Sequence, residues 1–92
     1  MIINFKNKGL EELFELGKSA KVNSKHFKKL RLILARLNTA VQISDMNFPG
    51  ADLHQLKGDK KDFWSISVNG NWRVIFKFKD EKVYDVDYLD YH

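Results

Sequence analysis

The chain has 92 residues, of which 43% are hydrophobic, and carries a formal net charge of +4. This length supports one domain with one core, so we expect residues 1–92 to form a single domain. The absence of cysteine excludes disulfides and thiolate metal sites. No stretch approaches the roughly 20 apolar residues of a membrane helix, and the first apolar run is too short for a signal peptide. We therefore expect a cytoplasmic protein with no membrane partner.

The charge is unevenly distributed along the chain. Residues 1–40 contain nine Lys or Arg and three Glu, whereas residues 80–92 contain one Lys and five Asp or Glu. Because Lys and Arg neutralise phosphates and release counterions, the basic part fits a polyanionic partner. Small soluble domains are also often basic without such a partner, so the charge alone leaves both interpretations open.

The first half of the chain predicts a short strand and two helices. Residues 1–5 read as the strand, and apolar residues recur at helical spacing over residues 8–17, where Gly17 is a plausible stop. A second helix is expected after a cap at Asn23 or Ser24. Its apolar face is formed by Phe27, Leu30, Leu34, Leu37 and Val41. The short connection predicts an antiparallel helical hairpin, and His26, which lies among lysines, is interpreted as solvent-exposed.

The second half predicts three strands. Residues 42–52 are polar and contain Pro49-Gly50, which indicates a loop. Apolar and polar residues then alternate over residues 64–68 and 72–79, and the Asn69-Gly70 between them is a strong hairpin signal because both turn positions need positive φ.

A second turn at residues 79–82 leads to a third strand, Val83–Leu89, with Tyr84, Val86 and Tyr88 expected on one face. The order β-α-α-β-β-β predicts an α+β fold, in which the helical hairpin packs on one side of a small, mainly antiparallel sheet.

The sequence lacks several motifs that carry well-known chemistry. It has no Gly-rich phosphate loop, no zinc-ligand spacing and no Gly-x-Ser-x-Gly nucleophile elbow. We therefore expect neither a metal nor another cofactor.

Three residues in the second half carry groups suited to proton transfer or phosphate binding. His54 and Lys57 lie in a short alternation that enters the sheet, although an ordinary loop would also place them there. Arg73 lies on a central strand, where an unpaired buried guanidinium is costly. It is therefore expected either to pair with Asp85 or Asp87 on the next strand or to point its planar fork at a phosphate.

The last residues directly continue a strongly patterned strand. Asp90 lies close enough in the chain to tune the imidazole of His92, while a terminal histidine more often belongs to a frayed tail. The pattern alone does not decide between these interpretations.

Four segments together resemble the HigB branch of the RelE/ParE toxin superfamily. They are residues 3–10, the Leu-x-x-Leu-Lys-Gly-Asp run of residues 53–59, the segment of residues 64–73 that ends in Trp-Arg, and the Asp-Tyr-x-Asp-Tyr-His run of residues 87–92. The resemblance extends over essentially the whole chain, and its motifs are specific.

This resemblance implies a fold, an activity and a set of partners. It implies a RelE-like, microbial-ribonuclease-type fold and a toxin of a type II toxin–antitoxin module, which cleaves mRNA in the A site of the 70S ribosome. It also implies a helix-turn-helix antitoxin of the HigA kind, through which alone the toxin reaches operator DNA. The family's catalytic positions fall on His54, Lys57, Arg73, Asp90, Tyr91 and His92.

The chemistry of these residue types fits metal-independent RNA cleavage. His54 and His92 are assigned to acid–base roles, because histidine transfers protons near neutral pH. Lys57 and Arg73 are expected to stabilise the charge that develops on phosphorus. Asp90 is expected to orient His92 or to transfer a proton itself, and Tyr91 to stack on a base or donate its hydroxyl.

Further residues are expected to bind RNA. Asn71 has an amide that is able to read an adenine, although a hairpin asparagine needs no such role. A basic surface of Lys25, Lys28, Lys29, Lys60 and Lys61 would dock ribosomal RNA, the alternative being a merely solvated face.

Two other functions remain open at this point. One is a non-catalytic growth inhibitor that binds DNA gyrase, as ParE-like relatives do. The other is a plain basic RNA-binding or adaptor domain. The acid–base residues favour the ribonuclease over the gyrase binder, and the RNA-binding or adaptor domain stays open.

Overall fold

Two α-helices and a four-stranded antiparallel sheet make up residues 1–91, the part of the chain that the computed structural model describes. The helices are α1 (Lys8–Leu16) and α2 (Phe27–Thr39), and the strands are β1 (His54–Gln55), β2 (Phe63–Asn69), β3 (Trp72–Lys79) and β4 (Lys82–Asp90). Short 3₁₀ turns lie at Ser24–His26, Ile43–Met46 and Gly58–Lys60. The predicted α+β class, with a helical pair on one side of an antiparallel sheet, is confirmed.

Local sequence determines where α1 begins and ends. The Asn7 side chain accepts a hydrogen bond from the Leu10 amide at 3.0 Å, which caps the first turn. Gly17 follows the last turn with φ of 79°, and its amide donates to the Leu13 carbonyl. This left-handed conformation favours glycine and ends the helix as predicted.

The second helix ends earlier than its apolar spacing predicts. Ala40 adopts an extended conformation (φ −65°, ψ 133°), so α2 stops at Thr39. Val41 therefore lies beyond the helix with 61% of its surface exposed, and its predicted place on the buried face is wrong.

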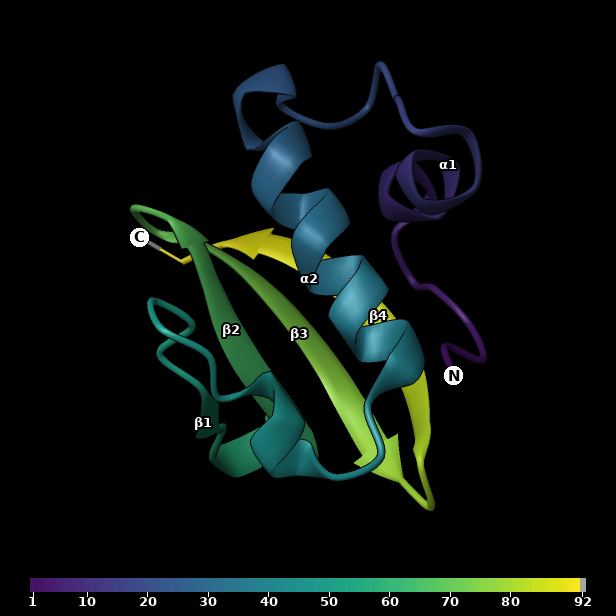
Figure 1. Ribbon diagram of the computed structural model, residues 1–92. Coiled ribbons are helices and arrows are strands. Elements are labelled where there is room, and N and C mark those ends of the chain that lie inside the picture. The colour runs from purple at the N-terminus through teal and green to yellow at the C-terminus, as the bar shows by residue number, and fades with distance from the viewer. Residues whose placement is uncertain (92) are drawn as a thin grey trace.

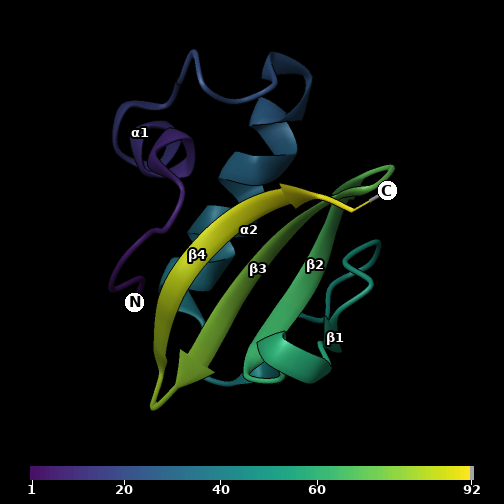
Figure 2. The same cartoon turned by 180° about the vertical axis from the view of Figure 1, so that it is seen from behind.

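The sheet is a simple meander, with strand order β1-β2-β3-β4 and antiparallel pairing throughout. Figure 1 shows α2 lying across one face of the strands, with α1 beside it. Figure 2 shows the opposite face, which the helices leave open and which the turn at Gly58–Lys60 flanks at one end. The α2 and sheet side chains meet in one core, whose fully buried members include Leu30, Ile33, Leu37, Val74 and Phe76.

A bulge in β4 changes which residues face this core. Asp85 has φ of 53°, and the pairing of β3 with β4 shifts register between Ile75 and Lys77. As a result Val83 and Val86 are both fully buried, although they are three positions apart on the strand. Tyr84 therefore lies on the face opposite Val86 and Tyr88, and the prediction that the three share one face is wrong.

The predicted N-terminal strand is reduced to two isolated bridges. Ile2 pairs with Val83 and Phe5 with Val86, both parallel to β4. Between them the Asn4 side chain bonds to Asp85 at the bulge, accepting from its amide and donating to its carboxylate. The bulge interrupts the ladder, so a continuous strand does not form.

The expectation that His26 is solvent-exposed is also wrong. Only 4% of its surface is accessible, because the 3₁₀ turn at Ser24–His26 directs it inward before α2 begins. Its Nδ1 atom is hydrogen-bonded to the hydroxyl of Tyr88.

No helix within residues 1–91 has the length and hydrophobicity needed to cross a membrane.

Candidate active site

The strand register places His54 and Arg73 on the open face of the sheet. His54 pairs with Ser65, which pairs with Ile75 on β3. Arg73 is two positions before Ile75 on the same strand and pairs with Ser67 and Leu89. Directly paired residues share a face, and residues two apart on one strand do as well. The side chains of His54 and Arg73 therefore project away from α2.

The Arg73 guanidinium is held by two partners. Its Nη2 lies 3.1 Å from the Asp52 carboxylate, and its Nη1 donates to the Ser65 hydroxyl at 3.3 Å. The Arg73 side chain is 21% exposed. The fork is therefore fixed in direction while part of it stays open to solvent, an arrangement that suits binding of an incoming phosphate.

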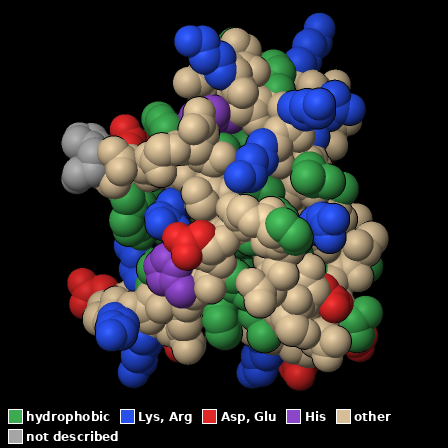
Figure 3. Space-filling model, turned by 60° about the vertical axis from the view of Figure 1, so that its left-hand side comes forward, with side chains coloured by type: hydrophobic (Ala, Val, Ile, Leu, Met, Phe, Trp, Pro, Cys, Tyr) green, Lys and Arg blue, Asp and Glu red, His purple; other side chains and the backbone are tan. Residues whose placement is uncertain are grey.

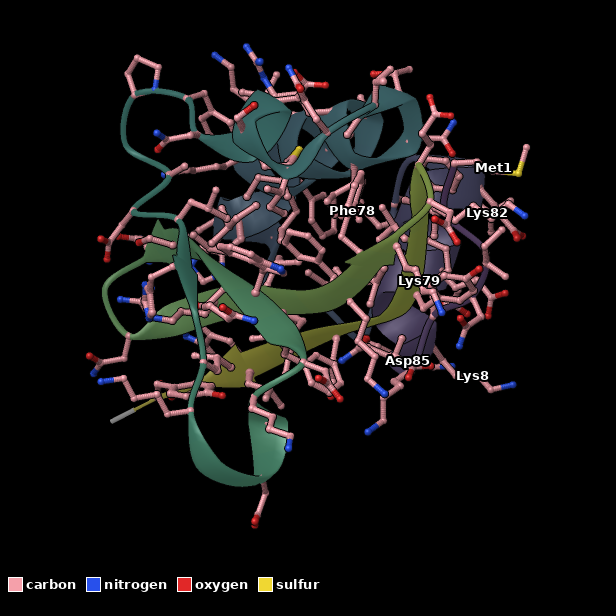
Figure 4. The ribbon with its side chains drawn as sticks, turned by 90° about the horizontal axis from the view of Figure 1, so that it is seen from below. Met1, Lys8, Phe78, Lys79, Lys82 and Asp85 are labelled. Atoms are coloured by element: carbon pink, nitrogen blue, oxygen red, sulfur yellow. The ribbon has the colours of Figure 1, made fainter. Side chains whose placement is uncertain are left out.

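The predicted pairing of Arg73 with Asp85 or Asp87 is wrong. Asp85 pairs with Lys77 at 3.4 Å and lies at the outer edge of the sheet, as Figure 4 shows. The Asp87 carboxylate instead accepts from the Tyr88 amide. The reason is register, because the β4 residue opposite Arg73 is Leu89.

His54 is oriented by the same residue as Arg73. Its Nδ1 lies 3.1 Å from the backbone carbonyl oxygen of Asp52. Because a carbonyl oxygen only accepts, Nδ1 carries the hydrogen in this bond. The Nε2 atom of the exposed ring is then the one available to take or give a proton. Figure 3 shows histidine, acidic and basic side chains gathered on one face of the molecule.

Asp52 is the residue of this cluster that the sequence analysis missed. It has φ of 49°, and the carbonyl of its buried neighbour Ala51 accepts from the Ser67 amide at 2.8 Å. That bond attaches the loop to β2 and brings Asp52 to the sheet. Its position two residues before His54 is a signal for the local contact with the His54 ring, but nothing in the sequence indicates its contact with Arg73.

A second group of candidate residues lines a cavity of about 320 Å³. Its walls are Leu56, Lys57, Asp59, Lys60 and Tyr91. The Tyr91 amide donates to the Asn71 carbonyl at 2.8 Å, which fixes the chain just beyond β4. The structure therefore places Lys57 and Tyr91, whose surface is 39% exposed, in the walls of one cavity. Lys60 adds a second positive charge to these walls, and its ammonium group lies over the Phe63 ring, 5.6 Å from the ring centre.

The remaining predicted residues are placed as follows. Asp90 ends β4 opposite Trp72, and Asn71 is exposed in the β2–β3 turn. His92 lies outside the described residues, so its predicted role stays a prediction. Lys25 and Lys28 are exposed and Lys29 is half-buried at the start of α2, and they line none of the cavity beside Tyr91.

Two further properties bear on the chemistry of the site: the pKa of Tyr88 and the arrangement of possible metal ligands. Burial raises the pKa of the Tyr88 hydroxyl, and the negative charge of Asp90 raises it further. Within residues 1–91, no group of three or more His, Cys, Asp or Glu side chains is arranged to hold a metal ion.

Comparisons with known proteins identify relatives over the whole chain. The chain is 40% identical over 92 residues to a protein of Proteus vulgaris named endoribonuclease HigB, with all of both chains covered. It is 33% identical over 98 residues to toxin HigB-1 of Vibrio cholerae, covering all of this chain and 98% of that one.

Solved structures match the fold at lower sequence identity. A chain of the YoeB–YefM complex from Staphylococcus aureus matches with a TM-score of 0.60 and 18% identity, over 100% of this chain and 95% of the other. The protein HP0894 from Helicobacter pylori matches with a TM-score of 0.52 and 17% identity, over 95% and 91% of the two chains. These matches support the predicted RelE-like arrangement of helices on the sheet.

The family model described as the RelE-like toxin of type II toxin–antitoxin system HigB matches residues 3–92. With this match and two relatives above 30% identity over at least 98% of their lengths, the chain belongs to the HigB family of RelE-like toxins.

Proposed function

We propose that this toxin is an endoribonuclease that cleaves mRNA in the ribosomal A site, and so acts in the cytoplasm. One observation carries the proposal: the Arg73 fork and the His54 ring are held on one open face by a common residue, Asp52. Full-length similarity to a protein named endoribonuclease HigB supports it. A gyrase binder would have no need of an oriented imidazole beside a guanidinium.

The proposed reaction uses the substrate's own 2′-hydroxyl as the nucleophile. Its oxygen attacks the adjacent phosphorus, a new P–O2′ bond forms, and the P–O5′ bond breaks. The products are a 2′,3′-cyclic phosphate and a 5′-hydroxyl end. No metal takes part in this proposal, so side chains take the 2′ proton, stabilise the pentacoordinate phosphorane and protonate the leaving oxygen.

The candidate residues divide these tasks. Nε2 of His54 lies free for proton transfer, and His92 is proposed as its acid–base counterpart, oriented by Asp90. Arg73 and Lys57 stabilise the extra negative charge on the phosphorane. Tyr91 stacks on a neighbouring base, because 39% of its surface is exposed at a cavity that Lys57 and Lys60 also line.

The proposed partners of the toxin are an antitoxin and RNA. As a type II system toxin, the chain acts with an antitoxin; we propose one of the HigA kind, with a helix-turn-helix domain that alone contacts operator DNA. Five lysines are proposed to dock ribosomal RNA: Lys60 and Lys61 near the cavity, Lys25 in the turn before α2, and Lys28 and Lys29 on α2. Asn71, in the turn beside Tyr91, is proposed to read an adenine.

The experiment that tests the proposal is induction of the toxin without an antitoxin, followed by mapping of new mRNA 5′ ends. We expect in-frame cuts, with 5′-hydroxyl ends that require phosphorylation before ligation. A 2′-O-methyl group at the cleaved nucleotide should prevent the cut in a reconstituted ribosome complex. DNA damage without new mRNA ends would favour the gyrase binder, and 5′-phosphate ends would contradict 2′-hydroxyl attack.

Arg73→Ala provides the test of the site. Loss of the fork should lower kcat for mRNA cleavage by about 100-fold or more, because it removes charge stabilisation from the transition state. Lys77→Ala is the matched control, since Lys77 is also on β3 and also paired with an aspartate. Equal activity of the Arg73 variant and wild type would overturn the site assignment.

A further inference from the structure

His26 is a buried titratable side chain that the proposed reaction does not use. It lies immediately before α2, only 4% exposed, and its Nδ1 is hydrogen-bonded to the Tyr88 hydroxyl on β4. Burying an imidazole is costly unless its polar atoms are satisfied, so an apolar residue would be the simpler choice at a site that needs only packing. The histidine therefore calls for a specific explanation.

Three aromatic rings meet at this point. Trp72 stacks on Tyr88 with ring centres 4.5 Å apart and planes at 24°. The His26 ring contacts both edge-on, at 5.8 Å from Trp72 and 6.0 Å from Tyr88. The cluster joins the start of α2 to the first residue of β3 and to the end of β4, so it fixes three elements relative to one another.

The candidate catalytic residues directly adjoin this cluster along the backbone. Trp72 precedes Arg73 and is the register partner of Asp90. Tyr88 lies two residues before Asp90, and Tyr91 is joined to the β2–β3 turn through the Asn71 carbonyl. Since side chains alternate across a strand, the rings point into the core while Arg73 points to the open face.

We propose that His26 is a positioning residue for the cleavage reaction. By hydrogen-bonding Tyr88 and packing on Trp72, it holds the strand ends that carry Arg73, Asp90 and Tyr91. The proposal rests on the proposed ribonuclease function. The physical reason for this role is that a buried hydrogen bond is directional. The bond to His26 therefore fixes the position of the Tyr88 ring, whereas apolar packing alone would leave the ring freer to shift.

Tyr88→Phe, His26→Phe and the double variant separate positioning from stability. Each single variant keeps a ring but leaves one buried polar group unpaired, so both should have a lower thermal midpoint. The double variant has no unpaired group, so its midpoint should return toward wild type. Its kcat should nevertheless stay about tenfold or more below wild type, with KM changed less than about twofold, because the site is no longer held in place. If kcat recovers together with the midpoint, His26 is merely structural and the proposal fails.

A second measurement does not depend on activity. Hydrogen exchange at the Tyr91 amide reports whether the chain beyond β4 is held, and it should be about tenfold faster in all three variants. Unchanged exchange in them would overturn the proposal. If wild type cleaves no mRNA, the proposed function fails, while Tyr91 exchange still tests the anchoring.

Ser19→Ala is the matched control for both measurements. Ser19, in the loop between α1 and α2, is also a buried polar residue, 8% exposed, and its hydroxyl donates to Glu12 of α1 at 2.8 Å. Its loss should lower the midpoint while kcat and Tyr91 exchange stay at wild-type values. If this variant lowers them as much as the His26 variants do, general destabilisation explains the effect and the proposal is wrong.

Discussion

At the scale of single residues, Asp52 has two separate contacts with the candidate site. Its carboxylate pairs with Arg73 and its backbone carbonyl accepts from His54. An incoming RNA phosphate would meet a guanidinium that already has an anionic partner. The carboxylate is 66% exposed, so it is able to give way to the phosphate while still directing the fork before RNA arrives.

Asp52→Asn should separate the two contacts. Asparagine tolerates the φ of 49°, so the carbonyl contact with His54 is kept while the ion pair with Arg73 is weakened. We expect cleavage to slow by about tenfold, as is typical when a residue that orients a reactive group is replaced. Stability should change by less than about 1 kcal/mol, because exposed ion pairs contribute little. Single-turnover cleavage and chemical denaturation measure the two effects.

Asp80→Asn is the control for this variant. Asp80 also has a left-handed conformation, with φ of 52°, but lies in the β3–β4 turn. If the two variants cleave at the same rate, the carboxylate of Asp52 does not direct Arg73.

At the scale of elements, the bulge at Asp85 determines which β4 residues face the core and how β4 pairs with the N-terminal segment. It lets Val83 and Val86 both face the core and interrupts the pairing of the N-terminal segment with β4. Hydrogen bonding from Asn4 holds the pKa of the Asp85 carboxyl below its ordinary range, and the ammonium group of Lys77 lowers it further. A lowered pKa in the folded state means that folding favours the ionised form.

The bulge should therefore make stability depend on pH in the acid range. The contribution of Asp85 is fully present above the pKa of the unfolded chain and is lost as pH falls through the lower folded value. Asp85→Asn should be less stable than wild type at about pH 6, and the difference should shrink by about pH 3. Urea denaturation of both proteins at the two pH values measures this. A difference that stays constant with pH would show that the charge of Asp85 does not stabilise the fold.

At the scale of the whole molecule, the charge is distributed over separate surfaces. Lys60 lies beside Lys57 and Tyr91 at the cavity, whereas Lys79 and Lys82 project at the β3–β4 turn, as Figure 4 shows. A lysine that contacts phosphate adds to the salt dependence of binding, whereas one that merely faces solvent does not.

Lys60→Ala should weaken binding of the ribosome–mRNA complex and reduce the slope of log Kd against log salt by about one. Lys82→Ala should leave the slope unchanged. Titrations of a fluorescent toxin at several salt concentrations measure both. Equal slopes for the Lys60 variant and wild type would remove Lys60 from the RNA-binding surface.

Features with a local cause were predictable from the sequence. The helical spacing gave the two helices, Asn69-Gly70 gave the turn between β2 and β3, and period-two alternation gave the central strands. The features that were missed depend on distant parts of the chain. The inward turn of His26 is decided by Tyr88, sixty-two positions away, and the partner of Arg73 comes from a loop twenty-one positions earlier. The site residues themselves came from family motifs, because spacing alone did not favour His54 over an ordinary loop residue.

The two parallel bridges between residues 1–5 and β4 have a consequence for how the chain folds during synthesis. Ile2 and Phe5 are synthesised long before their backbone partners, Val83 and Val86, which lie about 80 positions further along the chain. Contacts between such distant segments form late, because closing the intervening loop costs entropy. A nascent chain that still lacks β4 therefore has neither its edge pairing nor the strand that leads to Tyr91. The candidate site around Tyr91 is therefore assembled only after the whole of β4 has been synthesised.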